Sequence, residues 1–238
     1  MKKIILTLFV FISVLVEGNA QSVQAVDAVK FKELIATTKD AILLDVRTPA
    51  EYSRGHIAGS TAIDISDPAF VTRINLLQKD NTILLYCLSG SRSYSAANYM
   101  SEHGFKKIYH LQRGLMDWNQ RGFALEQSSQ TVASNSTAFT GQSFGKLLKD
   151  NKVVLVDFNA VWCAPCKAMN PVIDKISTDF KGKAHIEKVD VEANTEIATA
   201  YQVQSIPGFL IFKDGKKVWS HNGVISYDEL TGVLKKFL

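Results

Sequence analysis

The chain has 238 residues, of which 46% are hydrophobic and 21% charged, so it has the composition of an ordinary globular protein with enough apolar residues for a core. Its net charge is +4, but the basic residues are scattered, and their longest clusters are pairs such as Lys106-Lys107 and Lys235-Lys236. A nucleic-acid-binding protein is expected to concentrate its basic residues on one stripe or arm. The charge pattern therefore argues against a nucleic-acid partner.

The first twenty residues have the pattern of a secretory signal. Lys2 and Lys3 precede an apolar run over residues 4–16, and Gly18-Asn19-Ala20 places small residues at the two positions that a signal peptidase reads. As a helix, this run would cover about 20 Å, less than the roughly 30 Å of a bilayer's hydrocarbon core. We therefore predict a cleaved signal peptide over residues 1–20 and a mature protein in the periplasm or another extracytoplasmic space.

The chain contains three cysteines, Cys87, Cys163 and Cys166. Exported proteins usually pair their cysteines in structural disulfides. Three cysteines, two of them only three positions apart, are too few and too clustered for such a framework, and an odd number leaves one thiol unpaired. We therefore interpret these cysteines as chemically reactive residues and not as parts of a structural framework.

The first half of the chain alternates predicted helices with short apolar runs. A helix is expected around residues 28–37, and continuous apolar runs at 42–46 and 83–86 predict strands buried on both faces of a parallel sheet. A second helix follows the loop at Cys87 and ends near His103-Gly104, where the glycine supplies a left-handed cap. This alternation predicts an α/β domain.

The loop that follows the second predicted strand combines a cysteine with an arginine. Its sequence, Cys87-Leu88-Ser89-Gly90-Ser91-Arg92-Ser93, would place successive backbone N–H groups at a helix N-terminus, where anions bind. A cysteine at the base of this loop would be held as a thiolate, with Arg92 adding positive charge. Four residues separate Cys87 from Arg92, whereas loop-based tyrosine phosphatases and arsenate reductases use five to surround a tetrahedral oxyanion. The tighter ring favours a single terminal sulfur on the cysteine, which is a persulfide.

This half of the chain resembles the rhodanese family over residues 27–125. The residues that carry the resemblance are Leu44-Asp45-Val46-Arg47, Glu51-Tyr52, Gly55-His56-Ile57-Ala58-Gly59, the Cys87 loop, Gly114, Trp118 and Gly122. The resemblance implies that Cys87 is the catalytic sulfur acceptor and that Arg92 recruits an anionic sulfane-sulfur donor. It also implies that the persulfide is held by the backbone N–H groups of Leu88, Ser89, Gly90, Ser91 and Arg92.

Several residues depart from the usual rhodanese pattern. Ala58 stands at a usual proline position and Leu115 replaces the second glycine of a common Gly-Gly, which affects the loops near the site. Asp45, Arg47 and His56 are interpreted as structural residues. The alternative for the whole segment is a rhodanese fold that serves only as a docking module, although such modules often lose the cysteine that this chain keeps.

A polar stretch without hydrophobic periodicity predicts a linker over residues 126–136. The second half then repeats the α/β pattern, with a helix near 144–148, a strand at 153–158, a helix from Cys163, a strand near 186–189 and a helix near 196–201. Asp214-Gly215 between the apolar runs 209–212 and 218–221 predicts a β-hairpin. A final helix is expected over residues 227–237.

Cys163 and Cys166 lie three residues apart at the predicted start of a helix, where they can close a disulfide with little movement of the backbone. The helix N-terminus would stabilise a thiolate at Cys163, the attacking sulfur, and Cys166 would be the resolving sulfur. The alternatives are an inert disulfide or half of a zinc site. A closed zinc site needs four ligands, and this segment adds only His185 and His221, neither in finger spacing. The pattern favours a redox pair without metal or other cofactor.

Residues 137–238 resemble thioredoxin along their whole length. The matching landmarks, in thioredoxin order, are the strand at 153–158, Trp162-Cys163-Ala164-Pro165-Cys166-Lys167, Pro171 and Ile206-Pro207. The resemblance implies that Asp157 is a buried carboxylate with a raised pKa that relays a proton to and from Cys166, with Lys188 nearby. It also implies that Pro207 is a cis proline, that Ile206 offers backbone groups to the substrate chain, and that Trp162 belongs to the substrate surface. Ala164 and Asn159 stand where thioredoxins usually carry glycine and tryptophan.

The sequence thus predicts two α/β domains: a rhodanese-like domain with a parallel sheet, and a thioredoxin fold with a mixed sheet flanked by helices. The leading hypothesis is an exported thiol–disulfide oxidoreductase of the protein-disulfide reductase type with a persulfide-forming sulfurtransferase site, the two sites being coupled to release sulfide. A second hypothesis is a general extracytoplasmic disulfide reductase whose rhodanese domain only binds partners or serves a separate reaction. A third is a sulfur-carrier or interaction protein without turnover. The expected partners are protein disulfides, a small sulfane-sulfur donor and a membrane or periplasmic electron donor.

Overall fold

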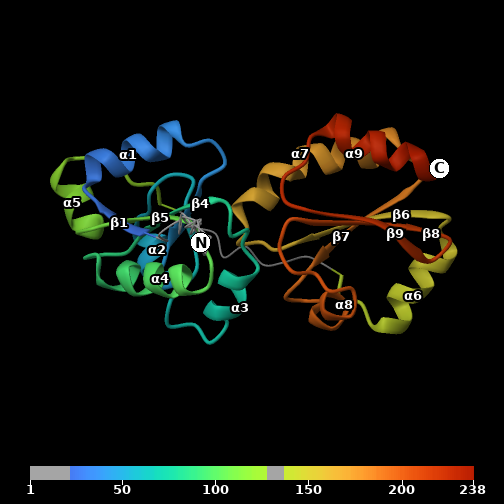
Figure 1. Ribbon diagram of the computed structural model, residues 1–238, viewed down its shortest axis with the longest axis horizontal. Helices are drawn as coiled ribbons and strands as arrows, with labels where there is room; N and C mark the ends of the chain where they lie inside the picture. Colours follow the sequence, from blue (N-terminus) through green and yellow to red (C-terminus); the bar gives the residue numbers. More distant parts are fainter. Residues whose placement is uncertain (1–21, 128–136) are drawn as a thin grey trace, which may run out of the picture.

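The computed structural model describes residues 22–127 and 137–238. The predicted signal peptide and most of the predicted linker lie outside these residues. The described chain forms two α/β domains that lie side by side, each built on its own sheet (Figure 1). The predicted fold class is confirmed.

The N-terminal domain has a five-stranded sheet in the order β1-β5-β4-β2-β3, in which every neighbouring pair is parallel. The strands are β1 (Ser22–Val26), β2 (Ile42–Asp45), β3 (Thr61–Ala62), β4 (Thr82–Tyr86) and β5 (Lys107–Leu111). The helices are α1 (Ala28–Thr37), α2 (Pro49–Arg54), α3 (Phe70–Asn75), α4 (Ser91–Glu102) and α5 (Gly114–Gln120).

Alternate strand residues of this sheet face two separate layers of helices, because successive side chains of a strand point to opposite faces. Leu43 and Leu84 pack in the cluster that contains Phe31 of α1 and Trp118 of α5. The residues next to them, among them Leu85, pack in the cluster that contains the α3 and α4 side chains. Burial on both faces explains the unbroken apolar runs of these strands.

The C-terminal domain has a mixed four-stranded sheet in the order β7-β6-β8-β9, in which β6 is parallel to β7 and antiparallel to β8. Its strands are β6 (Val153–Asn159), β7 (His185–Asp190), β8 (Gly208–Lys213) and β9 (Lys216–Asn222). Its helices are α6 (Gly141–Asp150), α7 (Ala164–Asp179), α8 (Thr195–Ala200) and α9 (Tyr227–Leu234), which a short 3-10 turn (Lys235–Phe237) follows. Helices α7 and α9 cover one face of the sheet, and α6 and α8 lie on the other (Figure 1).

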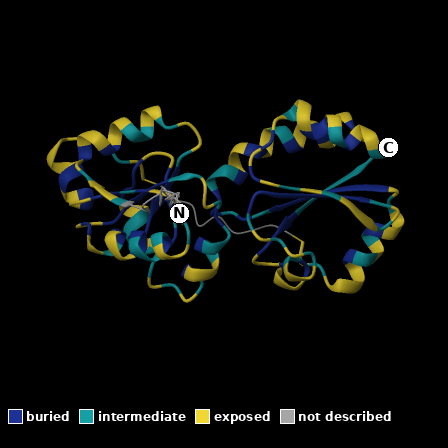
Figure 2. Ribbon diagram, in the orientation of Figure 1, coloured by how far each residue is buried: buried dark blue, intermediate teal, exposed yellow. Residues whose placement is uncertain are grey.

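Burial is concentrated in the strands of both sheets, and the outward surfaces of the helices are exposed (Figure 2). Among the described residues, no helix combines the length and apolar character that a membrane span would require.

The structure adds elements that the sequence patterns did not indicate: β1, β3, β5, α2, α3 and α5. It also moves one boundary, because Glu126 was expected to begin the linker. The backbone N–H and C=O of Glu126 both bond to His56, each at 2.8 Å, so Glu126 is part of the N-terminal domain.

The two domains contact each other through α3 and the loop that leads from it to β4. The backbone N–H of Ile206, in the C-terminal domain, donates to the carbonyl of Leu76 at 2.9 Å. Arg73 of α3 donates through Nε to Glu192 at 2.7 Å. The N-terminal end of α7 therefore lies against the N-terminal domain, close to β2 (Figure 1).

Candidate functional site

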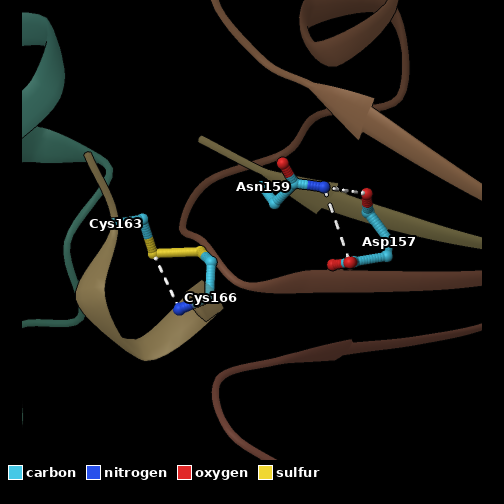
Figure 3. Close-up of a disulfide and its surroundings, with 4 residues drawn as sticks. All are labelled: Asp157, Asn159, Cys163 and Cys166. Atoms are coloured by element: carbon cyan, nitrogen blue, oxygen red, sulfur yellow. Dashed lines mark hydrogen bonds between the residues drawn. A yellow bond between two sulfur atoms is a disulfide. The ribbon is translucent and has the colours of Figure 1, made fainter. Parts of the chain in front are cut away.

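Cys163 and Cys166 form a disulfide at the N-terminal end of α7. Cys163 is the N-cap residue of this helix, and its Sγ accepts the backbone N–H of Cys166 at 3.2 Å (Figure 3). Strand β6 delivers the chain to this position, and Pro165 stands in the first helical turn, where its missing N–H costs little. When the pair is reduced, the positive end of the helix dipole stabilises a thiolate on Cys163.

Asp157 of β6 is buried near the disulfide, with 1% of its surface exposed. Burial raises its pKa to about 7, and the positive charge of Lys188 only partly opposes this effect. Its Oδ1 has no hydrogen-bond partner among the described residues. A carboxyl group that titrates near neutral pH can both accept and return a proton.

Asn159 and Lys188 flank Asp157. The Asn159 side-chain amide donates to the Asp157 carbonyl at 3.0 Å and approaches its Oδ2 at 3.5 Å (Figure 3). Lys188 pairs with Asp157 in the register of β6 and β7, but its ammonium group donates to Asn170 and to Asp174, at 3.1 and 2.6 Å. In the sequence, Asn159 stands out only as a departure from the thioredoxin pattern. Residues i and i+2 of a strand share one face, and this spacing was the available signal for its contact with Asp157.

The predicted substrate-binding residues Trp162, Ile206 and Pro207 lie at the contact between the domains. The peptide bond between Ile206 and Pro207 is cis. Only 7% of Trp162 and 1% of Ile206 are exposed, and Cys163 has no exposed surface. The backbone N–H that Ile206 would offer to a substrate is bonded to Leu76 of the same chain.

Cys87 is a free, buried thiol that follows β4 directly. Its Sγ accepts the backbone N–H of Gly90 at 3.1 Å. Burial alone would raise its pKa, but hydrogen bonds from Ser93, and from the backbone N–H groups of Gly90 and Ser89, outweigh burial and lower it. The Ser93 hydroxyl also lies 3.0 Å from the Gly90 carbonyl, so it serves one acceptor at a time. The loop therefore favours a thiolate at Cys87.

Two glycines allow the Cys87 loop to pack against the start of α5. Gly90 has a φ of 99°, and a Cβ added there would lie 1.8 Å from the carbonyl oxygen of Gln112. Gly114 has a φ of 54°, and a Cβ there would lie 2.4 Å from the Cys87 carbonyl oxygen. The N–H groups of Leu115 and Met116 donate to the carbonyls of Cys87 and Leu88, at 2.9 and 3.1 Å. The loop is thus fixed from both sides by backbone contacts.

The guanidinium of Arg92 is already paired and is not free to bind an anionic sulfur donor. Its guanidinium donates to both carboxylate oxygens of Glu51, at 2.8 and 2.6 Å. This pairing lowers the pKa of Glu51 to about 2. In the sequence, Glu51 is only a landmark of the resemblance to rhodaneses, and no local pattern predicts that it neutralises Arg92.

The remaining residues of the Cys87 loop are exposed around its opening. Leu88, Ser89 and Ser91 all lie at the surface, and 46% of Leu88 is exposed. Away from the loop, Asp45 and Arg47 form a buried ion pair, and Arg47 also donates to the Gly55 carbonyl at 2.7 Å. These two residues brace the end of β2, in keeping with their interpretation as structural residues.

The two cysteine sites are not brought together. Cys87 lies just after the C-terminal end of β4, whereas the other domain contacts the loop that precedes this strand. Five strand residues at about 3.3 Å each separate the two ends by about 17 Å. Among the residues that the structure describes, no group of three or more His, Cys, Asp or Glu side chains is arranged to hold a metal ion.

Comparisons with known proteins match each half of the chain separately. The family model described as a rhodanese-like domain matches residues 27–121, and the thioredoxin model matches residues 135–236. The chain is 37% identical over 112 residues to thioredoxin Y, chloroplastic, of Oryza sativa subsp. japonica, which covers 47% of the chain and 67% of that protein. It is 44% identical over 89 residues to a thioredoxin of Staphylococcus aureus, which covers 37% of the chain and 86% of that protein. A solved structure of Plasmodium falciparum thioredoxin aligns with a TM-score of 0.39 at 30% identity, covering 41% of this chain and 94% of the other.

The two family models agree with the paired cysteines at the start of α7 and with the domain order along the chain. The chain is a thiol–disulfide oxidoreductase. It belongs to the thioredoxin family, and it carries a rhodanese-like domain ahead of its thioredoxin domain.

Proposed function

We propose that the protein is an exported protein-disulfide reductase whose rhodanese-like domain carries a sulfurtransferase site at Cys87. The observation that carries the reductase assignment is the Cys163–Cys166 pair at a helix N-terminus, near a buried Asp157 whose pKa is raised to about 7. A dithiol needs these groups to attack a substrate disulfide and then to resolve the mixed disulfide that forms.

The proposed reduction begins with the dithiol form. The Cys163 thiolate attacks one sulfur of a substrate disulfide, so that the substrate S–S bond breaks, a mixed disulfide forms and one substrate thiolate leaves. Asp157 takes the proton of the Cys166 thiol. The Cys166 thiolate then attacks the Cys163 sulfur, which closes the Cys163–Cys166 disulfide and releases the second substrate thiolate. The substrate gains two electrons and the dithiol loses two.

A further dithiol or membrane electron donor must then return two electrons to Cys163–Cys166. Outside the cytoplasm the surroundings are oxidising, and we propose a membrane or periplasmic partner for this step. Export itself is proposed from the pattern of residues 1–20. Mass spectrometry of the mature protein tests it: an N-terminus close to Gln21 is expected, and a mature species that begins at Met1 would contradict it.

The sulfurtransferase proposal rests on the Cys87 loop. The Cys87 thiolate would attack the outer sulfur of a sulfane-sulfur donor such as thiosulfate, so that the donor S–S bond breaks and sulfite leaves with the electron pair. The lowered pKa of Cys87 and the N–H groups that face its sulfur support a thiolate before this step and a persulfide anion after it. The backbone hydrogen bonds from Leu115 and Met116 at the start of α5 hold the loop in place.

Two assays on full-length variants test both sites. With excess dithiothreitol, the protein should reduce insulin disulfides; Cys163→Ser should abolish this activity, and Cys87→Ser should keep it nearly intact. With thiosulfate and cyanide, the protein should form thiocyanate; here Cys87→Ser should abolish the activity and Cys163→Ser should keep it. The two variants serve as each other's controls. If the single substitution Cys87→Ser abolished insulin reduction, the assignment of the two activities to separate sites would be contradicted.

A second candidate function has its own supporting observation. The rhodanese-like domain places Leu76 on the backbone N–H of Ile206, beside the disulfide, and keeps Cys87 at the far end of β4. This arrangement favours a general disulfide reductase whose rhodanese-like domain acts on access to the thioredoxin site. Failure of the thiocyanate assay with retained insulin reduction would select this alternative.

A further inference from the structure

Residues 73–78 of the rhodanese-like domain, here called the covering segment, lie over the face of the thioredoxin domain that carries the disulfide. The ribbon of the N-terminal domain passes beside Cys163 (Figure 3). The central contact is the hydrogen bond from the Ile206 N–H to the Leu76 carbonyl, at 2.9 Å. A substrate chain that docks in extended form would use the same backbone N–H, since an extended peptide binds largely through backbone hydrogen bonds.

Apolar side chains fill the contact on both sides. Ile74 and Leu77 belong to one continuous cluster of buried residues with Trp162, Cys163 and Ile206. Leu77 is 2% exposed. Apolar burial of this kind contributes roughly 25 cal/mol per Å² of surface removed from water. The covering segment therefore packs in the same buried cluster as the attacking Cys163 and the residues around it.

Polar groups hold the two ends of the covering segment. At one end, Arg73 donates through Nε to Glu192 at 2.7 Å, and both side chains remain partly exposed. At the other end, Gln78 packs so closely on Gly223 that a Cβ at that glycine would lie 2.2 Å from the Gln78 amide nitrogen. The N–H of Gly223 in turn donates to the Pro207 carbonyl at 2.7 Å.

The contact is nevertheless imperfect. The Gln78 amide nitrogen is buried without a hydrogen-bond partner among the described residues, and such a group costs about 1–3 kcal/mol. A cavity of about 190 Å³ also remains between Gln78 and Asn81 on one side and Pro165 and Pro207 on the other. The covering segment closes the site without packing it to the density of a domain core, so the contact can open at modest cost.

We propose that the covering segment is a built-in pseudo-substrate that regulates the thioredoxin site. In the closed arrangement it occupies the backbone position of a substrate chain and excludes protein disulfides from Cys163–Cys166. A substrate reacts only after the covering segment leaves, so the observed rate is reduced by the fraction of molecules that are open. This inference rests on the proposed reductase function and adds its regulation.

Full-length variants at the two ends of the segment test the proposal. Glu192→Lys replaces an attraction to Arg73 by a repulsion, and Gln78→Glu buries an unpaired carboxylate in the contact. Both should raise kcat/KM for insulin reduction at saturating dithiothreitol by about fivefold or more. Gln78→Leu should lower it, because an apolar side chain of similar size removes the unsatisfied amide and tightens the closed state.

The matched control is Glu196→Lys, which makes the same charge change at an exposed position on α8, away from the covering segment. Hydrogen exchange supplies a second readout that does not depend on turnover. The Ile206 amide should exchange faster in Glu192→Lys and Gln78→Glu than in the parent chain, and Glu196→Lys should leave it unchanged.

The outcomes separate the two claims. If the parent chain reduces insulin and none of the contact variants changes the rate or the Ile206 exchange, regulation by the covering segment is overturned and the reductase function stands. If no variant reduces insulin, the reductase function is overturned, and the regulation of that function falls with it. Circular dichroism of each variant establishes that the domains remain folded.

Discussion

The carboxyl group of Asp157 shows how one buried residue sets the pH behaviour of the site. Its pKa rises from the ordinary 3.8 to about 7, chiefly because burial disfavours the charged form. A folded state that holds its proton more tightly than the unfolded chain loses stability as the pH rises between these two values. Above pH 7 this loss amounts to about 4 kcal/mol, at 1.36 kcal/mol for each pKa unit.

Replacing this carboxyl tests the cause of the shift. Asp157→Asn should be more stable than the parent chain at pH 8, by up to about 4 kcal/mol, and the difference should shrink as the pH falls towards 4. Insulin reduction should fall in the variant, because the proton of Cys166 has lost its acceptor. Urea unfolding at pH 4.5, 6 and 8 measures the stability difference, with the exposed Asp228→Asn as the control. A stability difference independent of pH would mean that Asp157 keeps an ordinary pKa.

The pKa of Glu51 is shifted in the opposite direction to that of Asp157. Its pKa is lowered to about 2, chiefly by the hydrogen bonds from Arg92, so at neutral pH it is a carboxylate that neutralises the arginine. A small anionic donor that approaches Cys87 must compete with this carboxylate for the guanidinium. Glu51 is therefore expected to set the affinity of the site for anions.

Removing the charge of Glu51 should release Arg92 for the donor. Glu51→Gln should lower the KM for thiosulfate by about twofold to fivefold, the range expected when one partly exposed charge pair is exchanged for another, and Arg92→Gln should raise it. The glutamine can still complete the capping box with Thr48 at the start of α2, so the fold is retained. The thiocyanate assay measures both. An unchanged KM in Glu51→Gln would show that Arg92 does not contact the donor.

At the scale of elements, the sequence patterns were most informative for long or strongly apolar segments. The parallel strands β2 and β4, the helix α4 with its glycine after the cap, and the β8–β9 hairpin all follow from local patterns. The site at the start of α7 could be predicted for the same reason, because strand end, cysteine pair and helix start are adjacent in the chain. Each of these features is determined by residues that are close together in the sequence.

The elements that were missed have weaker local signals. Helix α3 is only six residues long and has no side-chain cap, and β3 consists of two residues, too short for a periodicity to appear. The pairing of Arg92 with Glu51 and the contact of Leu76 with Ile206 join positions far apart in the chain, and no local pattern encodes them. One of the elements that local patterns did not predict, α3, supplies the first residues of the covering segment.

For the whole molecule, the arrangement of the domains bears on whether the two cysteine sites cooperate. The thioredoxin domain docks at the loop before β4, and Cys87 lies beyond the other end of that strand, about 17 Å away at about 3.3 Å per residue. Transfer of sulfur needs the reacting atoms in contact. In the closed arrangement, therefore, a persulfide on Cys87 is out of reach of Cys163 in the same chain.

The chemistry of such a transfer is straightforward once the sites meet. The Cys163 thiolate attacks the outer sulfur of the Cys87 persulfide, which returns Cys87 as a thiolate and leaves a persulfide on Cys163. The Cys166 thiolate then attacks the inner sulfur, closing the Cys163–Cys166 disulfide and releasing hydrosulfide. Whether this happens within one molecule depends on opening of the domain contact, not on either site alone.

A concentration series distinguishes transfer within a chain from transfer between chains. The dithiol is reduced, the reductant is removed, Cys87 is loaded with thiosulfate, and sulfide release is followed over a tenfold range of protein concentration. For the parent chain the first-order rate constant should be low at every concentration, because Cys163 is covered in closed molecules and is out of reach of Cys87 in the same chain and in other chains. For Glu192→Lys it should become faster and independent of concentration, since an open chain lets its own two sites meet at the high effective concentration that a tether provides. Cys166→Ser is the control, because it should accept the sulfur on Cys163 and release no sulfide. Equal rate constants in the parent chain and in Glu192→Lys would show that sulfur transfer does not depend on the domain contact.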